Sequence, residues 1–484
     1  MGYDIHDPWN VQRIAPTAAQ ALGPLGRRFV FPSATEEQSR RLLLADAQRP
    51  FTPSPARAVR FRAINQAAVN FAIISHRQLY GSAMDGATSV PNAAKEYAKF
   101  RASTAGGGYD TLLITTAQLY DQFHYGERSW LAMRHFGLWL AAGAPNNANR
   151  YLLLLGKGIV PSEGGTGYRN GGERGLDLVP TSSRAVSDNM LTANFQADDF
   201  VPKLRTGRLT VTTPQQVMNY LGKLRTHEAL GPEPWRKNVL HLVGGLSPAE
   251  TADFRAVMDR NKARVERPLF GGSVSTETRL TPSGLPATIN ISSYLNAGIS
   301  LMTYFGHGSN NTFALNFGAP SDPANNYNNQ GKYPFFYLNG CAANHTFTSG
   351  YTIVEDWLFA SQKGALGSLG EYGFSYPDQL EISIDTVYKL MFNNPQFYGK
   401  PITAIHAEAV RRLQNTTYFN NDIGVEQLLG TGWQGDPALA LFAPALPDFV
   451  ARLGVVVHHA RSRRWSRKSF IQQFCAECGR IEPG

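Results

Sequence analysis

Cysteine is scarce in this chain of 484 residues, which contains only three. Two of them, Cys475 and Cys478, stand close together near the end, so that Cys341 is alone in everything that precedes them. A single cysteine cannot form an internal disulfide, which excludes a disulfide-stabilised fold for that part of the chain. The Cys475–Cys478 pair has neither a second pair nor well-spaced histidines beside it, and this argues against a zinc site.

Long apolar runs are also missing. No stretch reaches the roughly 18 apolar residues of a membrane-spanning helix, and we therefore expect no membrane span. The N-terminus shows no basic region followed by an apolar run, so no signal peptide is visible there. We treat the chain as a fragment of a larger protein, in which residues 1–64 are the remnant of an upstream domain or a linker.

Positive charge is in excess but unevenly distributed. The formal net charge is +9, and the last 34 residues alone contain seven basic and two acidic side chains. We interpret the basic tail, 449–484, as non-native or disordered, and a tail of this kind is weak evidence for nucleic-acid binding. No nucleic-acid partner is expected. The histidines show no His-Glu-x-x-His spacing, so no resident metal ion is predicted either.

From residue 65 onwards, short apolar runs alternate with segments of helical spacing. Strands are predicted at 69–75, 109–115, 151–156, 204–211, 238–244, 299–305, 333–339 and 364–369, and helices at 92–101, 127–142, 214–227, 248–261, 378–393 and 401–414. We also expect a last apolar strand after residues 435–439. This alternation predicts an α/β fold, with a parallel sheet that is covered by helices on both faces.

Two of the predicted strands end in a glycine and a reactive side chain. One run is followed by Gly-His307-Gly and another by Gly-Cys341. Because ligands bind beyond the carboxyl ends of parallel strands, we expect His307 and Cys341 at the same edge of one sheet. The neighbouring glycines allow the backbone to turn sharply and to approach a substrate closely.

A cysteine and a histidine in this arrangement can act as nucleophile and base. A free thiol has a pKa of about 8.5, so little thiolate exists at neutral pH without a base. His307 would take the thiol proton and later pass it to a leaving amine. The backbone N–H groups of Gly308 and Cys341 would hold the substrate's oxyanion. The alternative is that Cys341 is a small core residue and that His307 closes a loop.

The segment that follows the strand predicted at 364–369 contains three candidates for a substrate pocket. Glu371 would favour basic substrate side chains, whereas Tyr372 and Phe374 would form an aromatic wall. His345 follows Cys341 by four residues and is an alternative base, although a position in a loop is the simpler interpretation.

The sequence resembles the gingipain-like C25 cysteine peptidases, and especially the PorU-type sortases of type IX secretion, over residues 65–448. The similar segments are Phe71–Ile74, Tyr151–Gly156, Pro202–Leu209 with Thr213-Pro214, Tyr304–Ser309, Gly331–Phe336 with Asn339–Cys341, and Gly364–Leu369. The resemblance implies a caspase-like fold (clan CD) with two α/β subdomains, at 65–234 and 235–448. It also implies that His307 and Cys341 form the catalytic dyad of the second subdomain.

The resemblance further implies a function. The implied activity is the cleavage or transpeptidation of secreted protein substrates. The enzyme would lie at the bacterial cell surface or outer membrane, or would itself be secreted, and its partners would be components of type IX secretion. PorU-type relatives remove C-terminal sorting domains and can transfer the product to a surface anchor. The alternatives are a secreted gingipain-like endopeptidase and a catalytically impaired scaffold subunit of the secretion machinery.

Two positions depart from the family pattern. Lys203 stands where many relatives have an acid that is thought to orient the histidine. Asp198 or Asp199 is a candidate substitute, and a backbone carbonyl is the alternative, with the two aspartates then belonging to a solvated or ion-binding loop. Lys157 follows Gly156 where relatives often have an aspartate that helps to build a calcium site. We therefore expect neither structural calcium nor any other cofactor.

Overall fold

The computed structural model divides into two compact units, Met1–Arg60 and Phe61–Gly484. It describes residues 2–6, 11–14, 41–44, 58–143, 149–160, 175–182, 186–195, 199–279 and 285–443. The first unit contains a small antiparallel sheet of order β2-β1-β3, made of β1 (Gly2–Asp4), β2 (Gln12–Ile14) and β3 (Leu42–Leu44). The predicted tail 449–484, with Cys475 and Cys478, lies outside the described residues.

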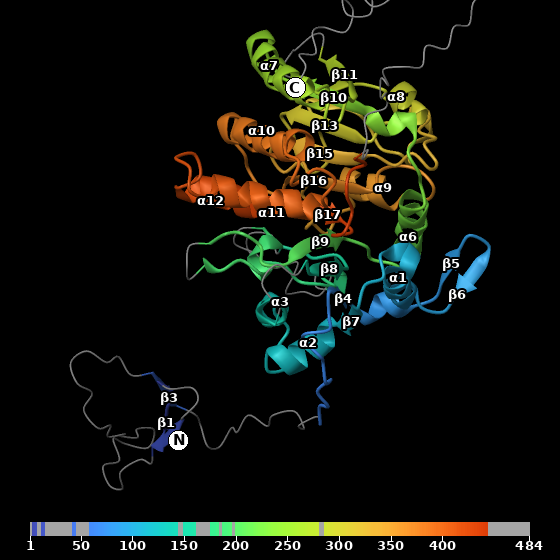
Figure 1. Cartoon of the computed structure of the whole chain (residues 1–484). Helices are drawn as coiled ribbons and strands as arrows, with labels where there is room; N and C mark the ends of the chain where they lie inside the picture. The colour runs from blue at the N-terminus through green and yellow to red at the C-terminus, as the bar shows by residue number, and fades with distance from the viewer. Residues whose placement is uncertain are drawn as a thin grey trace, which may run out of the picture. The chain divides into compact units, whose positions relative to one another are not determined.

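A sheet of ten described strands runs through the second unit (Figure 1). In chain order they are β4 (Phe71–Ser75), β7 (Thr111–Thr115), β8 (Tyr151–Leu155), β9 (Arg205–Leu209), β10 (Asn238–Gly244), β11 (Ser273–Thr278), β13 (Leu301–Gly306), β15 (Phe335–Asn339), β16 (Gly367–Glu371) and β17 (Thr431–Gly435). Their spatial order is β11-β10-β13-β15-β16-β17-β9-β8-β4-β7. Neighbours pair in parallel, except that β16 and β17 pair antiparallel. The sheet therefore consists of two parallel halves that run in opposite directions.

The strands at the centre of each half are buried throughout. Every residue of β4, β8, β13 and β15 is buried, and their sequences are almost continuous apolar runs. Such runs are typical of parallel strands that helices cover on both sides. All eight strands predicted from apolar runs are present, with ends shifted by three residues at most.

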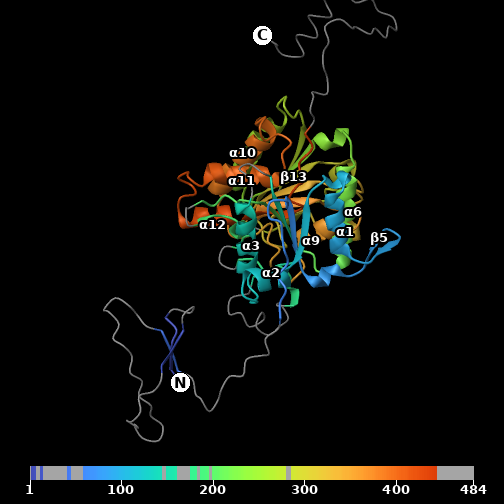
Figure 2. The same ribbon diagram turned by 60° about the horizontal axis from the view of Figure 1, so that its bottom comes forward.

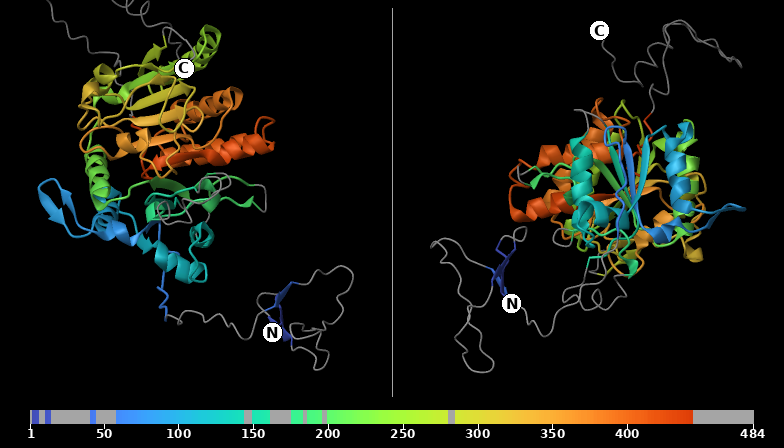
Figure 3. Two further views of the ribbon diagram at one scale, coloured as in Figure 1. Left: turned by 180° about the vertical axis from the view of Figure 1, so that it is seen from behind. Right: turned by 90° about the horizontal axis from the view of Figure 1, so that it is seen from below.

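Helices lie on both faces of the sheet (Figures 2 and 3). They are α1 (Ala93–Ala102), α2 (Thr116–Phe123), α3 (Trp130–Ala142), α6 (Pro214–Glu228), α7 (Pro248–Val265), α8 (Ser292–Ala297), α9 (Ile353–Phe359), α10 (Pro377–Asn393), α11 (Ile402–Leu413) and α12 (Asp422–Gly430). On one face α10 packs between α7 and α11, and on the other α6 packs between α1 and α9. The predicted α/β architecture is thus confirmed. Within the described residues, no helix is both long and apolar enough to cross a lipid bilayer.

The start of α7 is fixed by its local sequence. Ser247 is the N-cap residue, and its hydroxyl accepts the backbone N–H of Glu250 at 3.2 Å. Pro248 occupies the first turn, where its missing N–H leaves no partner unsatisfied. Since α7 follows β10 closely and β10 pairs with β13, this start lies at the carboxyl edge of the half-sheet that contains β13 and β15.

A last strand is predicted after residues 435–439, where the structure describes only residues up to 443. Within them Ala440 forms an isolated bridge with Pro401, and the last described strand is β17, which ends at Gly435. The sequence of β17, Thr-Gly-Trp-Gln-Gly, has low intrinsic strand propensity. Tertiary packing decides its position, because the Trp433 ring lies where a Cβ on Gly367 would otherwise be, 2.2 Å away.

Candidate active site

His307 and Cys341 follow two neighbouring strands at the same edge of the sheet. The strands β13 and β15 pair in parallel, with Phe305 opposite Asn339, and each reactive residue comes two positions later. Both side chains line one small cavity of about 60 Å³. They are therefore neighbours in space, as the sequence pattern predicted.

Glycine at position 340 lets the backbones meet at this edge, whereas position 308 has room for a Cβ. A Cβ on Gly340 would lie 2.4 Å from the carbonyl oxygen of Gly306, which is closer than any real contact of this kind. A Cβ on Gly308 would lie 3.5 Å from the carbonyl oxygen of Cys341. Position 340 accepts only glycine without a shift of the main chain.

The chain turns sharply directly after Cys341. Ala342 has a φ of +48°, in the left-handed region that residues with a side chain rarely adopt. Two hydrogen bonds fasten the turn to the segment at the end of β16: Ala342 N–H donates to Gly373 O at 2.7 Å, and Asn344 N–H donates to Glu371 O at 2.9 Å. The position of the thiol is thus determined by β15 and by the end of β16 together.

The thiol and two backbone donors face the same space. Cys341 Sγ donates to the carbonyl oxygen of Ser375 at 3.3 Å. In the part of the chain that the structure describes, neither the N–H of Gly308 nor that of Cys341 donates a hydrogen bond to another residue. Both groups are available to a ligand that lies beside the thiol.

The histidine ring is held by a carboxylate that was not among the sequence-based candidates. Nε2 of His307 lies 2.7 Å from Oε1 of Glu250. Because a carboxylate only accepts hydrogen bonds, Nε2 donates its proton to Glu250, and in the neutral ring Nδ1 carries the lone pair. The other oxygen of Glu250 accepts the N–H of Leu246 at 2.6 Å, so the carboxylate is fixed from both sides.

The environment of Glu250 keeps it ionised. Burial raises the pKa of this carboxyl group, but hydrogen bonds from Leu246 N–H and from His307, together with the charge of a protonated His307, outweigh it. The pKa of Glu250 lies below its ordinary value as a result. The site therefore presents an anion to the imidazole at neutral pH, and this anion stabilises positive charge on the ring.

The expectation that Asp199 orients His307 is wrong. Its carboxylate is bonded to the ammonium group of Lys203 and accepts the N–H of Val201 at 3.2 Å, in the segment before β9. Asp198 lies outside the described residues. Lys203 thus pairs with an acid four residues away, while the histidine takes its carboxylate from a different element.

Glu250 was missed because its sequence context has a sufficient local explanation. The segment Ser247-Pro-Ala-Glu250 is a typical helix start, in which the acidic residue belongs to the first turn. The signal that could have found it is topological. Glu250 follows the strand 238–244, and that strand is the neighbour of the one that leads to His307.

Comparison with known proteins agrees with this geometry. A family model described as peptidase family C25 matches residues 64–442. The chain belongs to this family. No curated protein matches the C25 domain in sequence.

Solved gingipain structures share the fold of this C25 domain. The crystal structure of the Arg-specific cysteine proteinase gingipain R aligns with a TM-score of 0.57 and 13% identity, over 78% of this chain and 80% of that chain. The complex of Porphyromonas gingivalis RgpB pro- and mature domains aligns with a TM-score of 0.58 and 14% identity, over 77% and 80%. Dimeric latent PorU from the same organism is 15% identical over 77% of this chain and 30% of that chain, with a TM-score of 0.33. The protein is a cysteine-type peptidase with a caspase-like fold, as the resemblance implied.

The three predicted pocket residues of the C25 domain do not line the cavity beside the thiol. Glu371 is 3% exposed, accepts the hydroxyl of Thr431 at 2.7 Å, and has a pKa that burial raises to about 8. Tyr372 is buried as well. Phe374 is almost fully exposed and lies in the loop that precedes Ser375. Glu371 therefore supplies no acid to the cavity beside the thiol.

His345 and Lys157 have local partners. The His345 ring lies against Phe347, with centroids 6.0 Å apart, and burial lowers its pKa. The ammonium group of Lys157 lies 2.7 Å from Glu355 Oε1 and donates to Gly350 O at 2.8 Å. Among the residues described, no group of three or more His, Cys, Asp or Glu side chains is arranged to hold a metal ion.

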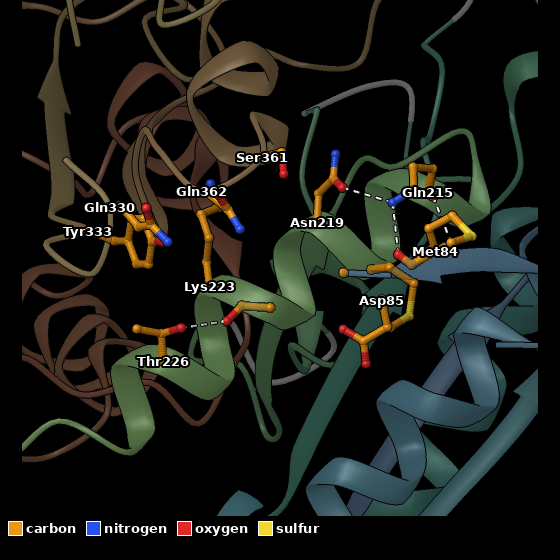
Figure 4. Close-up of a pocket in the computed structure, with 13 residues that line it drawn as sticks. Met84, Asp85, Gln215, Asn219, Lys223, Thr226, Gln330, Tyr333, Ser361 and Gln362 are labelled. Carbon is orange, nitrogen blue, oxygen red and sulfur yellow. Dashed lines mark hydrogen bonds between the residues drawn. The ribbon is translucent and has the colours of Figure 1, made fainter. Parts of the chain in front are cut away.

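Two larger cavities of the C25 domain are lined by neither His307 nor Cys341. One, of about 510 Å³, lies along α6 and is bordered by the hairpin of β5 (Ala83–Asp85) and β6 (Thr88–Val90) (Figure 4). There Gln215 bonds both the N–H and the carbonyl of Met84, at 2.8 and 3.0 Å. The other, of about 650 Å³, lies beside α1. The chemistry of the peptidase is therefore assigned to the smaller cavity.

Proposed function

We propose that this C25 domain cleaves protein substrates with Cys341 as nucleophile, His307 as base and Glu250 as the residue that positions the base. The observation that carries the proposal is the hydrogen bond between Glu250 and His307 beside a cavity that both His307 and Cys341 line. A nucleophile, a base and a group that orients the base are the components that thiol catalysis requires.

The geometry supports a definite order of proton transfers. Glu250 holds the proton on Nε2, so Nδ1 of His307 takes the proton of the thiol. The sulfur of Cys341 attacks the carbonyl carbon, and the N–H groups of Gly308 and Cys341 bind the oxygen as it becomes negative. When the intermediate collapses, the C–N bond breaks and the amine leaves with the proton from His307. A thioester remains on Cys341.

The thioester has two fates, which distinguish two functions. Attack by water releases the acid and completes a hydrolysis, whereas attack by the amine of a second molecule makes a new amide bond and completes a transfer. We propose the transfer function of a sortase in type IX secretion, on secreted proteins at the bacterial cell surface. The support is membership of the C25 family together with the resemblance of residues 65–448 to the PorU-type sortases. Secreted endopeptidase activity is the alternative.

A catalytically impaired scaffold is less well supported. The sequence feature in its favour was Lys203, which replaces an expected acid. Because Glu250 supplies a carboxylate to His307 from the start of α7, the substitution at position 203 leaves the histidine with a partner.

The test is a product analysis with the full chain and its Cys341→Ala variant. Both are incubated with an unstructured protein substrate and with a tagged glycine peptide as the amine acceptor, and products are identified by mass spectrometry. Tagged products that require Cys341 support transfer, and untagged fragments that require Cys341 support hydrolysis. A native protein that is folded and yields neither contradicts the proposal.

A further inference from the structure

The cavity beside the thiol is lined largely by apolar side chains. Phe254 from α7 and Phe305 from β13 pack with ring centroids 5.1 Å apart, in an edge-to-face arrangement. Pro377 and Leu380 from α10 close the cavity from another side. Phe254, Phe305 and Leu380 are each less than a tenth exposed, so their positions are fixed by the core.

The location of the cavity determines which part of a substrate it receives. Because Cys341 and His307 both line it, a carbonyl carbon placed at the sulfur has its own residue's side chain next to the cavity. That residue is the one on the acyl side of the bond to be broken. The cavity is small, at about 60 Å³, whereas the cavity that Tyr376 lines measures about 300 Å³. An alanine or valine side chain fits this space, whereas an arginine side chain is too long for it.

The charges around the cavity favour the same substrate side chains as its volume does. No aspartate or glutamate lines this cavity among the described residues. Both oxygens of Glu250 are used, by His307 and by Leu246, and Glu371 is buried against Thr431. A lysine or arginine side chain that entered here would lose its water without gaining an anionic partner, which is strongly unfavourable.

A second cavity close in the chain does contain an acid. Ser375 and Pro377 face the cavity beside the thiol, whereas Tyr376 lines a separate cavity of about 300 Å³ together with Asp378. A basic group of the substrate that met Asp378 would thus lie in a different subsite from the residue whose carbonyl is attacked.

We propose that this peptidase selects a small, uncharged side chain of the alanine or valine class on the acyl side of the scissile bond, and excludes arginine and lysine. Phe254 and Leu380 set the depth of the pocket. The proposal rests on the proposed function, since it assigns the cavity to the residue that Cys341 attacks. It also replaces the expectation that Glu371 would select basic side chains.

The experiment needs no variant. Peptidyl acyloxymethyl ketones that differ only in the residue next to the reactive group (alanine, valine, lysine or arginine) are reacted with the native full chain, and the labelling rate of Cys341 is followed by mass spectrometry. We expect the alanine and valine probes to react at least about 100-fold faster than the lysine and arginine probes. Equal or faster labelling by a basic probe overturns the specificity and leaves the proposed function standing. If no probe labels Cys341 although iodoacetamide does, the proposed function fails, and the specificity fails with it.

A matched pair of variants tests the depth of the pocket. Leu380→Ala deepens the cavity, whereas Val387→Ala removes a buried side chain of the same helix that does not line it. We expect Leu380→Ala to increase the labelling rate of a phenylalanine probe relative to the alanine probe about tenfold, and Val387→Ala to leave the ratio unchanged. An unchanged ratio in both folded variants contradicts the role of Leu380.

Discussion

The two halves of the sheet use charged residues in opposite ways. Beside β13 and β15, the Glu250–His307 pair is partly open to solvent, with 30% and 45% of the two side chains exposed. In the half that contains β8 and β9, Arg208 is fully buried and forms two hydrogen bonds of 2.7 Å with Asp188. Its Nη1 group donates to the carbonyl oxygens of Gly156 and Val179 as well.

The difference separates a stabilising charge from a reactive one. A buried pair in which every guanidinium nitrogen is hydrogen-bonded has no place for a substrate, and the loss of one partner leaves an uncompensated charge in the interior. An exposed pair contributes little to stability, but beside a cavity it remains available for proton transfer. Changes at the Glu250–His307 pair should therefore affect activity, and changes at the Arg208–Asp188 pair should affect stability.

The largest expected effect is on activity, at Cys341. Cys341→Ala removes the nucleophile, and kcat/KM should fall on the order of 1000-fold or more. Among the described residues the thiol makes one weak hydrogen bond, so thermal unfolding should hardly change. Parallel assays of peptide cleavage and thermal unfolding check these two expectations. Residual activity near that of the native protein would assign the chemistry to another group.

The next effect is on stability, at Arg208. Arg208→Met leaves Asp188 buried without its partner, and the free energy of unfolding should fall by about 3–5 kcal/mol. Denaturant unfolding measures it, with Arg260→Met as the control. The pair of Arg260 and Glu381 is exposed, and its loss should cost less than about 1 kcal/mol. The folded fraction of Arg208→Met should label at Cys341 as fast as the native protein. A stable variant with slow labelling would mean that the two halves are coupled.

Glu250→Gln should lower activity without lowering stability. The amide keeps the size of the side chain but removes the anion that holds the proton on Nε2 of His307, so kcat should fall on the order of 100-fold. Asp253→Asn, an exposed position on the same helix, is the control and should have no effect. Equal activities of the two variants would show that His307 needs no carboxylate.

The smallest effect concerns Glu371, which is buried near the site but takes no part in the chemistry. Burial raises its pKa from 4.5 to about 8, so between these values the native state keeps a proton that the unfolded state releases. Stability contributed by this group is thus lost as the pH rises from about 4.5 to about 8. Glu371→Gln should remove the loss, with a gain of about 1–3 kcal/mol at pH 8 and almost none at pH 4. Unfolding curves at the two pH values measure this, and a gain at pH 4 as large as that at pH 8 would exclude titration as the cause.

The sequence was sufficient for the part of the site that repeats a simple pattern. His307 and Cys341 each follow a continuous apolar run and a glycine, and adjacent parallel strands bring such positions together. Glu250 escaped the same reasoning because its local role at the start of α7 already explains its presence. What was missing was the neighbour relation of β10 and β13, which is a property of the fold.

The pocket could not be predicted for a related reason. Phe254, Phe305 and Leu380 come from three elements that are far apart in the chain, and each looks like an ordinary core residue. Glu371 was the opposite case, since a carboxylate shortly after a strand suggests a pocket acid until its burial is known. The strand β17 was not predicted because its sequence contains glycine and glutamine. Its position is fixed by the packing of Trp433 against Gly367.

The central claim is that Glu250, His307 and Cys341 act as one unit. The most direct test is to label the native protein with an alanine acyloxymethyl ketone probe, and to compare its adducts and rates with those of His307→Ala, Glu250→Gln and Asp199→Asn. We predict a single adduct on Cys341 that is absent in His307→Ala, formed slowly in Glu250→Gln and formed at the native rate in Asp199→Asn. Labelling that does not depend on His307, or that slows in Asp199→Asn but not in Glu250→Gln, would contradict the account.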